Sequence, residues 1–127
     1  MGKISPHRSR FRPWQRLRSP PEFRHVFRHG RARRDGLFTV IVAPSGQPAP
    51  RLGLAVSKKA ARLANQRNRI KRVVRESFRT AAPGLPPVDI VVIARPGAAN
   101  RSNGEIRSSI TSHWKRLAKR CAKSPTA

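Results

Sequence analysis

The sequence has few of the residues on which most enzymes and disulfide-rich proteins depend. It contains one cysteine, Cys121, no tyrosine and only five carboxylates among its 127 residues. A single cysteine excludes an internal disulfide framework and a cysteine-based zinc module. The carboxylates lack the pairing that two-carboxylate or two-metal catalysis requires. No run approaches 18 apolar residues, so we expect no membrane span. The chain is therefore not expected to supply catalytic groups of its own.

Basic residues dominate what the sequence does contain. Lys and Arg number 29, of which 22 are Arg, and the formal net charge is +24. Such a charge repels itself strongly unless a polyanion neutralises it. The planar guanidinium of Arg also suits phosphates and base edges better than the point charge of Lys. The composition indicates a protein that binds a polyanion, and a cytoplasmic location is the simplest account.

The length accommodates one domain and not two. Residues 1–18 are basic and broken by prolines, which predicts a flexible arm. Residues 19–118 have the pattern of a single α/β domain, and residues 119–127 are expected to form a C-terminal tail. We find no internal repeat.

Three helices are indicated by capping signals and periodicity. Ser19-Pro20-Pro21-Glu22 is a capping-box start, and Gly30 is a plausible end for that short helix. The strongest helix spans about residues 62–81, and a last helix begins near Asn103.

Three apolar runs predict strands, at residues 37–43, 51–57 and 88–94. A Pro/Gly loop joins the first two, so we expect them to be antiparallel neighbours. The order strand, long helix, strand suggests a parallel pair in a mixed sheet. The pattern thus predicts an α+β sandwich.

The long helix separates two faces when it is wound at roughly 100° per residue. Leu63, Ile70 and Phe78 lie on an apolar arc, and a continuous set of basic residues lies on the other. Arg67 is the exception, because it falls on the apolar arc. A charged helix face is often merely solvated, but here Glu76 alone interrupts the positive run. Ion pairs along the helix cannot offset that repulsion, so we favour polyanion binding.

These residues also carry a family resemblance. Residues 65–79, NQRNRIKRVVRESFR, resemble the signature of the bacterial ribonuclease P protein family, with its RNRxKRxxRExFR core intact. Residues 17–30, 52–59 and 89–95 are similar to other family segments, in the same order and at the same spacing. The resemblance covers about residues 17–118.

The resemblance implies a two-layer α/β sandwich whose mixed four-stranded sheet holds the long basic helix in a left-handed βαβ crossover. It implies a monomeric subunit of an endoribonuclease that removes the 5′ leader from precursor tRNA. The catalytic RNA subunit would supply the active site with Mg²⁺, and no cofactor is expected on the protein alone.

The resemblance also implies two binding regions. The first contacts the catalytic RNA through the basic helix and the turn before it, with Arg67, Asn68, Arg69, Lys71, Arg72, Arg75, Lys58 and Lys59. The second is a cleft for the single-stranded leader, with Phe23, Phe27, Thr39 and Ile41. Unpaired bases can stack on such aromatics, although Phe23 and Phe27 could equally staple the first helix to the core.

Other candidates have plainer interpretations. His113 shares an apolar stripe with Trp114, which indicates packing. His25 and His29 are expected at the surface or on phosphates rather than on a metal. Trp14 in the basic arm is a weak candidate for base stacking.

Two other functions remain open on the sequence. A ribosomal protein would share the size, charge and small α/β fold, and it would have no effect on leader cleavage. A metal-dependent nuclease would need clustered acids or histidines, which the sequence does not offer.

Overall fold

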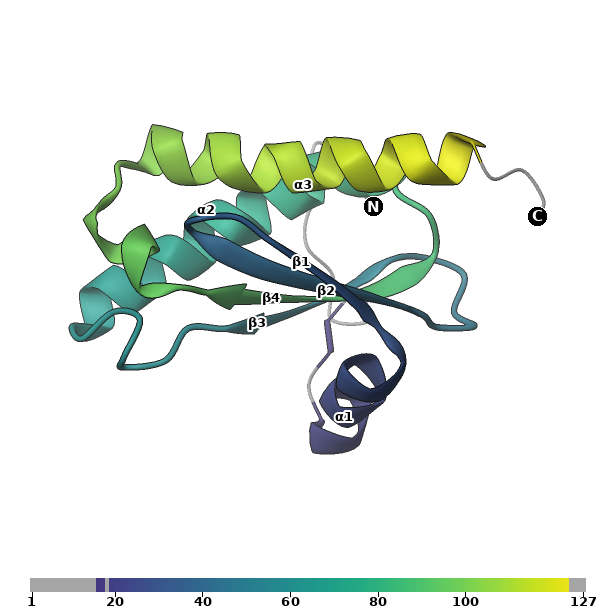
Figure 1. Cartoon of the computed structure of the whole chain (residues 1–127), viewed down its shortest axis with the longest axis horizontal. Coiled ribbons are helices and arrows are strands. Elements are labelled where there is room, and N and C mark those ends of the chain that lie inside the picture. Colours follow the sequence, from purple (N-terminus) through teal and green to yellow (C-terminus); the bar gives the residue numbers. More distant parts are fainter. Residues whose placement is uncertain (1–15, 18, 124–127) are drawn as a thin grey trace, which may run out of the picture.

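The computed structural model describes residues 16, 17 and 19–123, with side chains to residue 119. Two helices, α2 and α3, lie together on one face of a four-stranded sheet, and α1 lies on the other face (Figure 1). The mixed α+β sandwich expected from the sequence is confirmed, with α1 as an addition on the second face. In chain order the elements are α1 (Pro20–His29), β1 (Arg31–Arg34), β2 (Phe38–Pro44), β3 (Arg51–Ala55), α2 (Ala64–Ala81), η3 (Ala82–Gly84), β4 (Val88–Ala94), η4 (Pro96–Asn100) and α3 (Asn103–Lys123).

The ends of α1 are those that its sequence predicts. The backbone N–H of Glu22 donates to Ser19 Oγ, and the Glu22 carboxylate accepts the backbone N–H of Ser19 at 3.0 Å, which completes the capping box. Gly30 ends the helix and donates its N–H to the carbonyl of Val26 at 2.7 Å. A Cβ at Gly30 would lie 2.4 Å from that carbonyl and 3.1 Å from the carbonyl of Val42. Only glycine allows the chain to leave α1 so close to the sheet.

The strand order is β1-β2-β4-β3, so the expected pairing of residues 37–43 with residues 51–57 is wrong. β4 lies between them, antiparallel to β2 and parallel to β3. Ile90, Val91 and Val92 of β4 are all fully buried, the first and last on one face of the sheet and Val91 on the other. A strand that is apolar on both faces belongs in the middle of a sheet. The parallel pair expected around the long helix is confirmed.

Strand β1 has no counterpart in the pattern of the sequence. Its four residues, Arg-Ala-Arg-Arg, are all exposed and pair antiparallel with β2 at the edge of the sheet. No apolar alternation exists there, so periodicity cannot indicate a strand.

Two apolar clusters hold the layers together. The larger lies between the sheet and the α2–α3 layer, where Phe78 and Trp114 meet edge to face with ring centroids 5.8 Å apart. Trp114 Nε1 donates to Ser77 Oγ at 2.9 Å, so its polar atom has a partner inside the core. The smaller lies beneath α1 and consists of Leu17, Val26, Ile41, Ala43 and Val91, with Phe23 and Ile93 against it.

Several ends differ from expectation. α2 begins at Ala64, so Leu63 precedes the helix and is 52% exposed rather than docked on the sheet. Leu17 is buried and donates its N–H to the carbonyl of Leu52, so packing reaches into the segment expected as an arm. α3 continues to Lys123. Trp14 lies outside the described residues.

Candidate nucleic-acid interface

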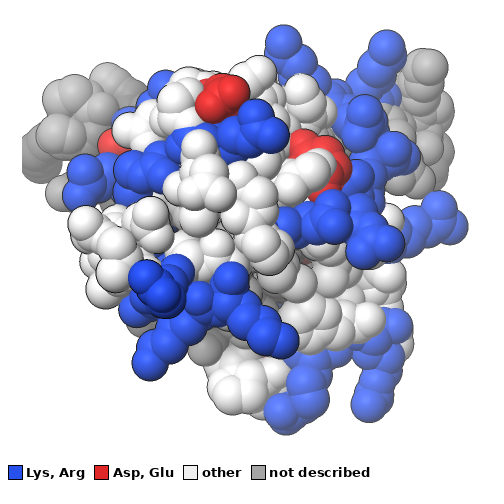
Figure 2. Space-filling view, turned by 60° about the vertical axis from the view of Figure 1, so that its left-hand side comes forward, with Lys and Arg blue, Asp and Glu red and all other residues white. Residues whose placement is uncertain are grey.

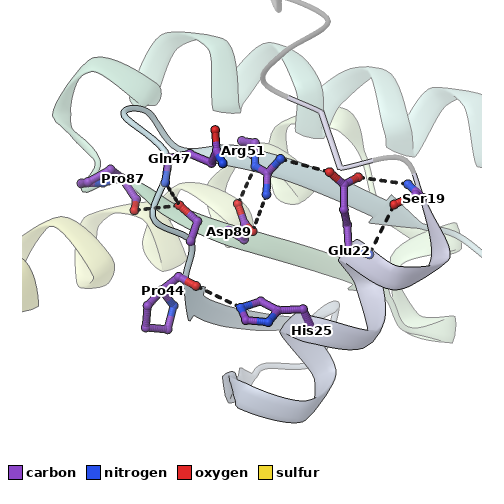
Figure 3. A network of polar contacts seen from close by, with 9 residues as sticks. Ser19, Glu22, His25, Pro44, Gln47, Arg51, Pro87 and Asp89 are labelled. Atoms are coloured by element: carbon purple, nitrogen blue, oxygen red, sulfur yellow. Dashed lines mark hydrogen bonds and ion pairs between the residues drawn. The ribbon is translucent and has the colours of Figure 1, made fainter.

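A charged cluster fixes α1 against the sheet. Arg51 on β3 donates from Nε and Nη2 to the two carboxylate oxygens of Asp89 on β4, each at 2.8 Å, and from Nη1 to Glu22 Oε2 at 3.0 Å (Figure 3). The hydrogen bond to Asp89 raises the pKa of Arg51 above its ordinary value. This effect is larger than the lowering that burial causes. The same Glu22 caps α1 with Ser19. One guanidinium thereby sets where α1 lies over the sheet.

The residues expected to bind the leader lie where α1 packs on the sheet. Side chains alternate along a strand, so Thr39 and Ile41 face α1 together with Ala43. The Phe23 ring lies directly over Gly53 of β3. A Cβ at Gly53 would lie 2.7 Å from that ring, so any larger residue would collide with it. The absence of a side chain on Gly53 lets α1 approach the sheet closely.

The four cleft candidates do not share one environment. Ile41 is buried, and Thr39 and Phe23 are half-buried. Phe27 is 51% exposed, and its ring centroid lies 6.4 Å from that of Phe23. Phe23 therefore staples α1 to the small cluster, whereas Phe27 leaves an aromatic face open to solvent.

The basic residues of α2 and of the preceding turn differ in exposure. Asn68 and Arg72 are exposed, as are Lys58 and Lys59 in the turn, while Lys71 and Arg75 are partly covered. Burial lowers the pKa of Arg75, and the positive charge of Arg16 lowers it further. Among the described residues, no basic side chain of α2 forms an ion pair.

Two of the candidate arginines bind the protein's own backbone. Arg67 Nη1 donates to the carbonyls of Ala61 and Arg62 at 3.0 and 2.9 Å. Arg67 thus folds back over the start of α2 from the apolar arc. Its partners are neutral, so its charge is not cancelled.

Arg69 connects α2 to the start of α3. It donates to the carbonyls of Ala99 and Arg101 at 3.2 and 3.1 Å and to Asn103 Oδ1 at 2.8 Å. These partners lie 30 to 34 residues away in the chain, and no signal in the sequence indicates them. Arg69 therefore has a structural role as well as a positive charge.

The surface is basic over wide areas. On the face shown in Figure 2, Lys and Arg side chains gather in several groups around a neutral centre, and acidic side chains show only as small areas. Within the described part of the chain, no group of three or more His, Cys, Asp and Glu residues could hold a metal ion. None of the described helices has the length and apolar character needed to cross a bilayer. This surface suits a large polyanion better than a small substrate.

An α+β domain with a basic helix that lacks acidic partners among the described residues is typical of proteins that bind RNA. Residues 11–118 match the model of the family described as Ribonuclease P. The chain is 43% identical over 109 residues to the ribonuclease P protein component of Pseudoalteromonas atlantica, covering 86% of this chain and 91% of that one. It is 45% identical over 107 residues to that of Thioalkalivibrio sulfidiphilus, covering 84% and 89%.

A solved structure agrees with these relatives. The ribonuclease P protein of Staphylococcus aureus superposes with a TM-score of 0.75 at 31% identity, over 83% of this chain and 95% of that one. The chain therefore belongs to the bacterial ribonuclease P protein component family, as a subunit of the endoribonuclease that processes the 5′ end of tRNA. The resemblance seen in the sequence is confirmed. Membership implies association with the ribonuclease P RNA, and it excludes a ribosomal protein.

Proposed function

We propose that α2 and the turn before it bind the catalytic RNA, while the cleft beneath α1 binds the 5′ leader of precursor tRNA. One copy of the chain would serve one RNA in the bacterial cytoplasm, where precursor tRNA is made. The RNA, with its Mg²⁺ ions, would carry out the cleavage. The observation that supports this division of roles is the set of uncompensated cations on α2.

The α2 surface has the chemistry of a phosphate-binding face. Arg72 and Asn68 point to solvent, and Lys58 and Lys59 extend the positive charge beyond the start of the helix. Arg67 and Arg69 add charge from fixed positions, because hydrogen bonds to carbonyls hold their guanidiniums. Fixed cations lose less conformational entropy when phosphates bind. Neutralising about 6–10 phosphates would weaken binding about 10³–10⁵-fold between 50 and 200 mM salt.

The cleft has the chemistry of a single-strand site. Phe27 offers an open ring for stacking beside the half-buried ring of Phe23, and the buried Ile41 supports α1 from beneath. Stacking of this kind tolerates different bases, because every base has a π face. A leader of variable sequence suits such a site.

The chain would promote cleavage without performing it. Its buried carboxylate Asp89 is bound by Arg51, and Glu22 is bound by the same guanidinium. These carboxylates build the fold and are not arranged around a reacting atom. Binding energy spent on positioning RNA and leader is the contribution that this surface can make.

Single-turnover cleavage of a precursor tRNA at low Mg²⁺ tests the proposal. The catalytic RNA is assayed with wild-type chain, with Arg72→Gln and with Arg107→Gln, a matched loss of one exposed positive charge on α3. We expect wild-type chain to accelerate cleavage and to be inactive alone. Arg72→Gln should weaken binding to the RNA at least about fivefold and lower the salt slope by about 1. Equal effects of the two variants would contradict the assignment to α2.

A further inference from the structure

A pocket of about 610 Å³ opens between α3 and the β1–β2 edge of the sheet. This volume is within the range of pockets that hold small ligands. It lies on the α3 face of the sheet, whereas α1 lies on the opposite face (Figure 1). Its lining includes Arg31, Arg33, Val40, Val42, His113 and Arg116.

The register between β1 and β2 places arginines beside valines in this pocket. Arg31 pairs with Val42 and Arg33 pairs with Val40. The two arginines therefore point to the same face of the sheet as the two valines. Arg116 approaches the pocket from α3. The result is an apolar floor, formed by the partly buried Val42 above the buried Val40, with guanidiniums on both sides.

These guanidiniums have no carboxylate partner among the described residues. The nearby acid, Asp35, is occupied, since its Oδ1 accepts the N–H groups of Leu37 and Phe38 and its Oδ2 accepts the Ser109 hydroxyl. Arg33 and Arg116 reinforce the effect of burial in lowering the pKa of His113, against the opposing charge of Asp35. Three guanidiniums and the His113 imidazole thus line one small concave region.

His113 lines the pocket and has one buried ring nitrogen without a hydrogen-bond partner among the described residues. The residue is 5% exposed. Its Nε2 lies 3.4 Å from Asp35 Oδ2 but makes no well-oriented hydrogen bond to any described residue. Unsatisfied buried polar groups are costly and often mark a functional position.

We propose that this pocket is a second RNA site, which holds a nucleotide of a single strand with its base on Val42 and its phosphates on Arg33 and Arg116. A pocket of about 610 Å³ has room for one nucleotide and is too small to admit a duplex. The apolar floor gives a base, rather than a bare phosphate, a surface to cover. The site rests on the proposed function in its choice of RNA as ligand, and it adds a contact on the face of the sheet opposite the leader cleft.

The test compares two double variants that each remove two positive charges. Arg33→Gln/Arg116→Gln alters the pocket, and Arg107→Gln/Lys115→Gln removes two exposed charges elsewhere on α3. Full-length chains are titrated with a fluorescein-labelled pentauridylate carrying 4-thiouridine, and the cross-linked residues are mapped by mass spectrometry. Thermal unfolding checks that both variants fold.

We expect cross-links in β2 and in the second half of α3. The pocket variant should weaken binding about tenfold and lower the salt slope by about 1.4, which corresponds to two single-strand phosphates. The control variant should change affinity less than twofold. Equal losses in the two variants, or cross-links confined to α1 and the cleft, would overturn the second site. Displacement of the pentauridylate from the pocket by deca-glutamate at equal charge concentration would also overturn it, because charge alone would then explain binding.

The leader-cleavage assay separates this inference from the proposed function. If wild-type chain accelerates cleavage but the pocket variant behaves like the control in binding, only the second site fails. If wild-type chain does not accelerate cleavage but cross-links map to the pocket, the proposed function fails and the pocket remains an RNA site.

Discussion

Arg51 and Asp89 form a two-point ion pair across the parallel strands β3 and β4, where they are direct partners in register. Asp89 is 2% exposed, and the third contact of the guanidinium goes to Glu22 on α1. A carboxylate this deeply buried is tolerated because both of its oxygens accept charged hydrogen bonds. The pair thereby joins two strands and a helix through one side chain.

Removing one member of this pair should destabilise the protein strongly. We expect Arg51→Met to lower the free energy of unfolding by about 3–5 kcal/mol, because it leaves the buried carboxylate of Asp89 without its cation. Urea unfolding followed by circular dichroism measures the change. Arg101→Met is the control, since its pair with Glu105 is exposed and such pairs contribute about 0–1 kcal/mol. Similar losses in the two variants would contradict the role given to Arg51.

Gly30 should tolerate no side chain. Gly30→Ala would place a methyl group against the backbone carbonyls of Val26 and Val42, and we expect a loss of about 2 kcal/mol or more. Gly36→Ala is the matched control, because its Cβ would meet nothing within 4 Å. Its effect should stay below about 1 kcal/mol. Thermal unfolding of both variants decides the comparison, and a fully stable Gly30→Ala would disprove the close approach.

Phe27 should contribute to leader binding without contributing much to stability. Phe27→Ala removes a half-exposed ring, so its thermal midpoint should stay near that of the wild type. Affinity for a precursor tRNA with a leader should fall by about 1–3 kcal/mol, the range for loss of one stacked base. Affinity for tRNA without a leader should not change. An equal loss with both RNAs would remove Phe27 from the leader site.

Stability should fall between neutral and mildly acidic pH because of His113. Burial lowers the pKa of His113 in the folded protein below its ordinary value of 6.5, although Asp35 opposes this effect. The unfolded chain therefore binds a proton more readily, and the stabilisation, complete above pH 6.5, is lost as the pH falls below it. His113→Gln should flatten the dependence of the free energy of unfolding on pH between 5 and 7. An unchanged slope would show that another group controls this range.

The parts of the fold that the sequence predicts are those specified by local chemistry. Ser19, Glu22 and Gly30 define α1 within twelve residues, and a continuous apolar run defines β4. Which strands are neighbours depends on segments far apart in the sequence, so the local pattern wrongly predicts that β2 pairs with β3. A short loop after Pro44 suggested a hairpin, but β4 needs apolar partners on both sides and so takes the central position. The continuous apolar run of β4, which indicates burial on both faces of the sheet, is the signal that points to its central position.

The candidate site divides in the same way. Helical periodicity predicts the basic face of α2, and Asn68 and Arg72 on that face are exposed in the structure, as expected. The attachment of Arg69 to Ala99 and Asn103 follows from how α3 packs, which no local pattern contains. The pocket beside β1 was missed for a related reason. Arg31 and Arg33 have the spacing of a strand, but a strand without apolar residues gives no periodic signal.

The central position of β4 has a consequence for synthesis of the chain. Strands β2 and β3 both pair with β4 and not with each other, so a nascent chain that ends before Val88 has no sheet on which α1 and α2 can both pack. The basic helix is translated before the strand that gives it a docking surface. Folding is thus completed late, through contacts between distant segments, which favours slow formation. We expect the two proposed RNA-binding regions of a ribosome-bound chain to form only after residues 88–94, and the α3 residues that pack against α2, have left the exit tunnel.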